Sequence, residues 1–354
     1  ILGFFRIWSI PAHAVEGIMG RFMPAIPVSI NEIFSKSITF ERTRYTEPYV
    51  TDSILIDLFE DKKDEVKKTF FSGLKLKEKF NTQRKVEAYF KTDKTFDNKI
   101  KQGLYDLISN VIFFEVPDSN GQEFHFRFAM QDTYSFKNLD RHSQKELTAI
   151  YVDYFFHRQD ELWKKEAMKK LPGLKSNTAM LVCGEDLGMV PHCVPEVMEQ
   201  LGILSLEIQR MPKKTGSEFF HPNDAPYLSV VSPSTHDMST IRGWWEEDNF
   251  KTKHFFNHLM GQNGEPPFYC EAWINKEIIL QHLYSPAMWS IFQLQDLMGM
   301  NADLRREDPN EERINIPAEA EHYWNYRMHI NLEDLLNEKA FTEELKNYIK
   351  ESGR

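Results

Sequence analysis

The stretch Ala179-Met180-Leu181-Val182-Cys183-Gly184-Glu185-Asp186-Leu187-Gly188 decides the fold of this chain, because a short apolar run ends in it abruptly at two acids. Val230 and Val231 lead in the same way into the stretch Ser234-Thr235-His236-Asp237. Short apolar runs are typical of buried β-strands, and α/β barrels keep their catalytic groups at the carboxyl ends of their strands. The two stretches therefore predict that Glu185 and Asp237 follow two strands of one parallel sheet.

Strand-like and helix-like segments alternate through this part of the chain. The expected strands are residues 180–183, 204–209, 227–231 and 290–294, and the expected helices lie at about 195–201, 251–261, 275–283 and 332–351. Such alternation predicts a parallel sheet. Because an eight-stranded barrel cannot close with so few strands, we predict the α/β fold class, as the C-terminal half of a (β/α)8 TIM barrel with a mostly helical insertion.

The predicted domain organisation has three parts. Residues 1–30 are expected to form a barrel strand end and the following loop, residues 31–145 the mostly helical insertion, and residues 146–354 the C-terminal half of the catalytic barrel. The insertion begins where the pattern becomes helical and charged. It would therefore separate the first segment of the barrel from the rest.

Two local patterns mark the end of the insertion. Residues 111–116 and 122–128 are β-type runs joined by an Asn-Gly turn, which predicts a hairpin. Ser143 is expected to cap one long helix that reaches Pro172. These elements would lead from the insertion into the barrel half.

Composition limits the function classes. The chain has 354 residues, 43 basic and 53 acidic, and a net charge of −10, which argues against nucleic acid as a partner. No apolar run approaches the ~20 residues that a membrane span needs, and the apolar start has no basic leader or cleavage site, so neither a membrane segment nor a signal peptide is expected. We predict a cytoplasmic protein.

The cysteines support the same interpretation. Cys183, Cys193 and Cys270 are too few for a disulfide scaffold and too scattered for a zinc site. We therefore expect reduced thiols, no metal and no cofactor. Aromatic residues make up 13% of the chain, and those beside polar loops are candidate platforms for stacking sugar rings: Trp8, Trp244, Trp245, Tyr323 and Trp324.

Several short stretches, in this order, carry a family resemblance. They are residues 3–8, 154–159, 183–188, 208–212, 234–237, 242–245 and 313–317. Together they resemble the 4-α-glucanotransferases of glycoside hydrolase family 77, the amylomaltases or disproportionating enzymes, and most of all their long, plant-cytosolic type. The resemblance implies a retaining transfer of glucosyl or maltooligosyl units from maltose or maltodextrin to the 4-OH of a glycogen- or starch-like acceptor.

The resemblance also implies roles for single residues. Glu185 would be the general acid/base, and Asp237 the third carboxylate, which holds ring hydroxyls of the sugar. His236 and Asn315 would contact the same sugar, and Gln209 and Trp8 would line the cleft. The family's nucleophilic aspartate stands two residues before the position of Ile1, so we expect this chain to need the N-terminal half of the protein as a partner and to be inactive alone.

Each of these residues also has a simpler interpretation. Glu185 could be solvated beside a turn capped by Asp186, and Asp237 could cap a helix that begins near Ser239. His236 could be a hydrogen-bonded loop histidine, and Asn315 a turn residue. Two other functions stay open: an α-amylase-type glucan hydrolase, and a glucan-binding module without catalysis.

Overall fold

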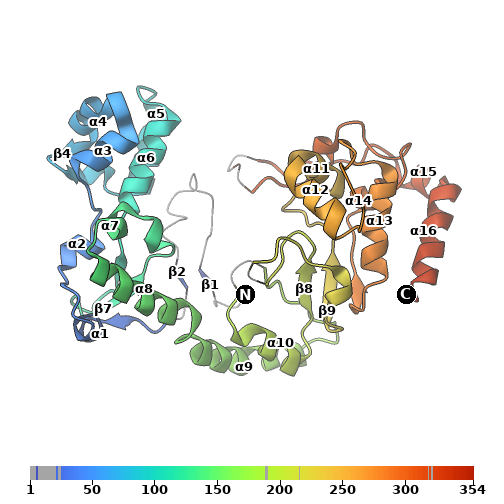
Figure 1. The fold of residues 1–354 in the computed structure, drawn as a ribbon, viewed down its shortest axis with the longest axis horizontal. Coiled ribbons are helices and arrows are strands. Elements are labelled where there is room, and N and C mark those ends of the chain that lie inside the picture. The colour runs from blue at the N-terminus through green and yellow to red at the C-terminus, as the bar shows by residue number, and fades with distance from the viewer. Residues whose placement is uncertain are drawn as a thin grey trace. The chain divides into compact units, whose positions relative to one another are not determined.

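The computed structural model describes residues 5–6, 21–22, 25–187, 190–214, 216–317, 319 and 322–354. Trp8 lies outside these residues. The chain divides into two compact units, Ile1–Lys170 and Leu171–Arg354, and the division falls within one helix, α9 (Asp160–Ser176). Both units are rich in helices and contain only small sheets (Figure 1).

The first unit is built mainly of short helices. They are α1 (Ile30–Ser35), α2 (Arg42–Thr46), α3 (Asp52–Phe59), η2 (Glu60–Lys62), α4 (Lys63–Phe70), η3 (Glu78–Phe80), α5 (Gln83–Thr92), α6 (Asn98–Ile108), η4 (Met130–Asp132), α7 (Tyr134–Lys137) and α8 (Arg141–Phe156). Thr51, Thr82 and Asp97 each cap a helix by accepting a backbone N–H bond. Helices α3 to α6 enclose a core that includes Phe59 and Phe70.

The predicted hairpin is confirmed. Strands β6 (Phe113–Glu115) and β7 (Glu123–Phe126) pair antiparallel with Phe113 opposite Phe126, and β3 (Val28–Ser29) pairs with β7. The other strands of this unit form two small antiparallel pairs: β1 (Phe5–Arg6) with β2 (Arg21–Phe22), and β4 (Phe71–Ser72) with β5 (Lys75–Leu76).

Helix α8 packs against the hairpin. The ring of Tyr154 lies 5.5 Å from that of Phe126, and its hydroxyl lies 2.8 Å from Nδ1 of His125. These contacts explain why the compact unit extends beyond residue 145, where we predicted the boundary of the barrel half.

The prediction of a single long helix capped by Ser143 is wrong in two respects. Asp140 is the N-cap, since its carboxylate accepts the backbone N–H of Ser143. The helix also ends at Phe156, and α9 begins only at Asp160. In the interruption, the side-chain amide of Gln159 exchanges two hydrogen bonds with the backbone of Ile26. Pro172 lies inside α9 instead of ending it.

The second unit carries a parallel sheet whose spatial order follows the chain. A parallel bridge joins Cys183 to Leu204, and β8 (Ser205–Ile208), β9 (Ser229–Ser232) and β10 (Trp289–Ser290) follow side by side. Sequential parallel neighbours are the arrangement of successive β/α units. The first and last of the predicted strands are shorter than expected, and the half barrel itself stays a prediction.

The other elements of this unit are helices. They are α10 (Cys193–Leu201), η5 (Pro222–Asp224), α11 (Ile241–Glu247), α12 (Asn249–His258), α13 (Ala272–Leu283), α14 (Leu294–Met298), η6 (Pro309–Glu312), α15 (Leu332–Asn337) and α16 (Lys339–Glu351). Helices α11 to α13 share a core that includes Trp245 and Phe255. Helix α16 packs beside α13, where Lys276 and Glu344 form a 2.8 Å ion pair (Figure 1). Within the described residues, no helix combines the length and apolar character that crossing a bilayer requires.

Candidate active site

Glu185 follows the bridge at Cys183 directly. The N–H of Gly184 donates to the carbonyl of Leu204 over 2.8 Å, which ties this segment to the start of β8. A Cβ on Gly184 would lie 2.8 Å from Cε of Met198, so glycine permits the close approach of α10. The side chain of Glu185 is exposed, and its Oε1 accepts the N–H of Leu187 over 3.2 Å.

The neighbouring Asp186 points inward instead. Its Oδ1 accepts the N–H of Leu206, and its Oδ2 lies 2.6 Å from Nζ of Lys213. Lys213 also contacts Oε1 of Glu207 over 2.8 Å, and both carboxylates are buried. Burying two carboxylates requires a compensating charge, and Lys213 supplies it to Asp186, the residue that follows Glu185. Lys213 and Glu207 were not predicted as site residues from the sequence, where their one signal is an acid inside the apolar strand 204–209.

Asp237 lies in a cluster with two other predicted site residues. The side-chain amide of Asn315 donates to Oδ1 of Asp237 over 2.6 Å, and Nε2 of His236 lies 3.3 Å from Oδ2. The backbone N–H of Asn315 also donates to the carbonyl of His236 over 3.1 Å. The side chains of His236 and Asp237 are 54% and 53% exposed, so this polar cluster is open to a ligand.

An aromatic residue borders the cluster. The ring of Trp324 lies 5.1 Å from that of His236, and Trp324 is 54% exposed. It is therefore available for stacking, as the sequence suggested. Trp244 and Trp245 are not: they are 9% and 0% exposed and belong to the core of α11 and α12.

Gln209 lies at the end of β8, but its side chain turns inward. It is 1% exposed, and its amide nitrogen donates to Oε1 of Gln281 over 2.7 Å. The structure thus does not bring the Gln209 side chain to the Asp237 cluster. A contact with substrate stays a prediction for Gln209, as it does for Trp8.

The sheet relates the two candidate carboxylates. Cys183 and β9 lie on either side of β8, and all three run parallel. Glu185 and Asp237 both follow the carboxyl ends of their strands and so leave the sheet at the same edge. Among the described residues, no three His, Cys, Asp or Glu side chains are arranged to hold a metal ion.

α/β enzymes place catalytic groups at the carboxyl ends of parallel strands, and Glu185 and Asp237 both lie there. Residues 1–333 match the model of glycoside hydrolase family 77, described as 4-alpha-glucanotransferase, and the chain belongs to this family.

Curated relatives carry the same description. The chain is 38% identical over 365 residues to 4-alpha-glucanotransferase DPE2 of Oryza sativa subsp. japonica, a match that covers 100% of the chain and 38% of the relative. It is 29% identical over 214 residues to 4-alpha-glucanotransferase of Chlamydia trachomatis, which covers 59% of the chain and 37% of the relative. The chain therefore spans well under half the length of these relatives.

A solved structure is also similar. The amylomaltase from Streptococcus agalactiae in complex with acarbose aligns with a TM-score of 0.40 and 21% identity, over 53% of this chain and 35% of that chain.

Proposed function

We propose that this chain carries the acid/base part of the active site of a cytoplasmic, retaining 4-α-glucanotransferase, with Glu185 as the acid/base. One observation carries the proposal: Glu185 and Asp237 leave the parallel sheet at one edge, and Asp237 is held there by Asn315 and His236. Family membership supports the reaction class.

Glu185 protonates the glycosidic oxygen as the bond to the leaving 4-OH breaks, and it then removes the proton of the acceptor 4-OH that attacks the glycosyl intermediate. Its exposure supports this role, because a leaving oxygen needs direct access to the acid. The bond from the Leu187 N–H engages only Oε1, so Oε2 remains available for the proton.

Asp237 binds hydroxyls of the sugar ring. The Asn315 amide engages its Oδ1, while His236 lies beside Oδ2. The carboxylate is thereby fixed before substrate binds, which lowers the entropic cost of orienting it. The exposed ring of Trp324 completes this side of the site by stacking on a sugar.

We do not assign the nucleophile to this chain. In the family resemblance it stands before the position of Ile1, and we propose that it comes from a preceding N-terminal segment. The donors are maltose or maltodextrins, and the acceptors are glycogen or starch-like glucans.

Product analysis tests the proposal. Maltose and glycogen are incubated with the chain alone and with the chain plus the N-terminal half, and the products are separated by mass. We expect lengthened glucan and free glucose only in the sample that contains both the chain and the N-terminal half. Glucose without lengthened glucan would identify an α-amylase-type hydrolase, and binding without turnover in either sample would identify a glucan-binding module; both outcomes contradict the proposal.

A further inference from the structure

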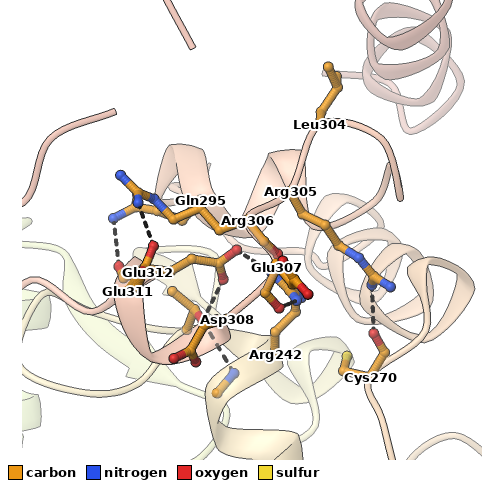
Figure 2. Close-up of polar contacts among 12 residues, drawn as sticks. Arg242, Cys270, Gln295, Leu304, Arg305, Arg306, Glu307, Asp308, Glu311 and Glu312 are labelled. Carbon is orange, nitrogen blue, oxygen red and sulfur yellow. Dashed lines mark hydrogen bonds and ion pairs between the residues drawn. The ribbon is translucent and has the colours of Figure 1, made fainter. Parts of the chain in front are cut away.

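A buried ion pair joins two residues that lie close in sequence to Asp237 and Asn315. Arg242 and Glu312 are 5% and 3% exposed, and Nη1 of Arg242 donates to Oε1 of Glu312. The guanidinium also donates to the carbonyls of Arg306, over 2.9 Å, and Glu307, over 3.4 Å. Figure 2 shows Arg242 facing Glu312, with Arg306 and Glu307 nearby.

The pair joins the two segments that carry the cluster. Arg242 lies in the first turn of α11, which follows the segment of Asp237, and Glu312 ends η6, which leads to Asn315. The hydroxyl of Thr240 adds a bond of 3.1 Å to Oε2 of Glu312. Both carboxylate oxygens of Glu312 are thus held by residues at the start of α11.

A second contact lies near the other end of α11. Nη1 of Arg313 is 3.6 Å from Oε1 of Glu247, and its Nε donates to the carbonyl of Asn315 over 3.0 Å. Helix α11 therefore holds the segment before Asn315 at both of its ends. Within the described residues, the side-chain amide of Asn315 makes one hydrogen bond, the one to Asp237.

The energetics favour a role in positioning. Burial raises the pKa of the Glu312 carboxyl, and the adjacent Arg242 opposes this increase only in part. Buried ion pairs often contribute little net stability compared with apolar residues, because desolvation offsets the Coulomb attraction. Their directional hydrogen bonds nevertheless fix the two segments in one register.

We propose that Arg242 and Glu312 are positioning residues for the active site: they hold η6 against α11 so that the amide of Asn315 meets Oδ1 of Asp237. The effect on catalysis rests on the proposed transferase function. The geometric effect does not, since it concerns one hydrogen bond within this chain.

A double-mutant cycle tests whether the pair acts through Asn315. In the active protein that contains this chain, Glu312→Gln is expected to lower kcat/KM by about tenfold, because small misplacements of binding groups slow catalysis. In an Asn315→Ala background, the same change is expected to lower it by less than about twofold, since coupled residues are not additive. Equal losses in both backgrounds would overturn the proposal and leave only a structural role for the pair.

The matched control is Glu311→Gln. Glu311 lies one residue earlier, and its 60% exposed side chain pairs with Arg306 over 2.7 Å, a contact also drawn in Figure 2. Exposed pairs contribute little, so this variant is expected to keep both kcat/KM and the thermal unfolding midpoint. Arg242→Lys keeps the buried charge but loses the forked contacts, and it replaces Glu312→Gln in the cycle if that variant does not fold.

An activity-independent measurement separates the two proposals. In the chain labelled at asparagine nitrogen, the side-chain amide resonance of Asn315 is assigned by its loss in Asn315→Ala. Glu312→Gln, or Arg242→Lys, is expected to move this resonance toward those of exposed asparagines, and Glu311→Gln is expected to leave it in place. An unmoved resonance in the folded Glu312 or Arg242 variant would overturn the positioning role, whereas a wild-type protein without transferase activity would overturn only the proposed function.

Discussion

The carboxylate of Asp237 accepts a 2.6 Å hydrogen bond from the side-chain amide of Asn315, which lies 78 residues further along the chain. A second bond, from the Asn315 N–H to the carbonyl of His236, fixes the same two loops. Asp237 is more than half exposed, so this contact is not needed to satisfy a buried group. It orients an accessible carboxylate, which the proposed binding of sugar hydroxyls by Asp237 requires.

Removing the Asn315 amide should impair catalysis more than folding. Asn315→Ala is expected to lower kcat/KM by about tenfold or more, because hydrogen bonds to charged groups are worth roughly 1.5–3 kcal/mol. Asn310→Ala is the control, since the side-chain amide of Asn310, in helix η6, donates to the exposed N-cap residue Asp308. Steady-state kinetics check the prediction, and equal kinetics for the two variants would contradict it.

Trp324 should contribute to glucan affinity. Trp324→Ala is expected to weaken the binding of maltooligosaccharides by about 1 kcal/mol, or roughly fivefold, through loss of a stacking surface. Trp289 is the matched control, because it is 50% exposed, against 54% for Trp324, but lies in β10. Titration calorimetry on the Glu185→Gln background measures the affinity without turnover. Equal losses for the two tryptophan variants would exclude a specific role for Trp324.

Lys213 should be important for stability. Lys213→Met leaves the buried carboxylates of Asp186 and Glu207 without their shared cation. Breaking a buried ion pair on one side is strongly destabilising, and we expect a loss of about 3 kcal/mol in the free energy of unfolding. Lys214→Met, at the exposed next position, should change it little. Urea unfolding measures both, and a stable Lys213→Met protein would show that the network does not need its cation.

His282 should make the second unit sensitive to acid. The side chain is fully buried, and this desolvation lowers its pKa from 6.5 to about 4, with Arg210 adding to the effect. The unfolded chain therefore binds the proton first. The stabilisation that neutral His282 provides is complete above pH 6.5 and is lost progressively as the pH falls toward 4. For this shift in pKa, the loss in the free energy of unfolding is roughly 3 kcal/mol.

The test compares two histidine substitutions. In His282→Gln, the free energy of unfolding should decrease less between pH 6.5 and about pH 4 than in the wild type. His258→Gln, at an exposed position in α12, should keep the wild-type decrease. Denaturant unfolding across this pH range measures the slope. A slope unchanged by His282→Gln would refute the assignment.

The local patterns of the sequence predicted the elements around the site. The apolar runs before Glu185 and Asp237 do lie in one parallel sheet, because strand burial leaves a direct mark on the sequence. The capping alternative for Asp237 is wrong. Thr240 is the N-cap of α11, since its hydroxyl accepts the N–H of Gly243, and the carboxylate of Asp237 is thereby free to meet Asn315.

The tertiary contacts could not be predicted in this way. Nothing local in the sequence pairs Arg242 with Glu312, which lies 70 residues away, or separates the buried Trp245 from the exposed Trp324. Burial depends on which face of α11 packs against α12, and the break after α8 depends on the contact of Gln159 with Ile26 over 133 residues. Such contacts follow from the assembled fold and not from the period of a segment.

The acid/base role of Glu185 is the central claim, and the choice of leaving group tests it directly. Glu185→Gln and the control Glu199→Gln, at an exposed position in α10, are compared with maltose and with α-glucosyl fluoride as donors, in the protein that also contains the nucleophile. Fluoride leaves without protonation, so Glu185→Gln should lose about 10²–10⁴-fold in turnover of maltose but retain glycosyl-enzyme formation from the fluoride. An equal loss with both donors, or full activity on maltose, would contradict the account.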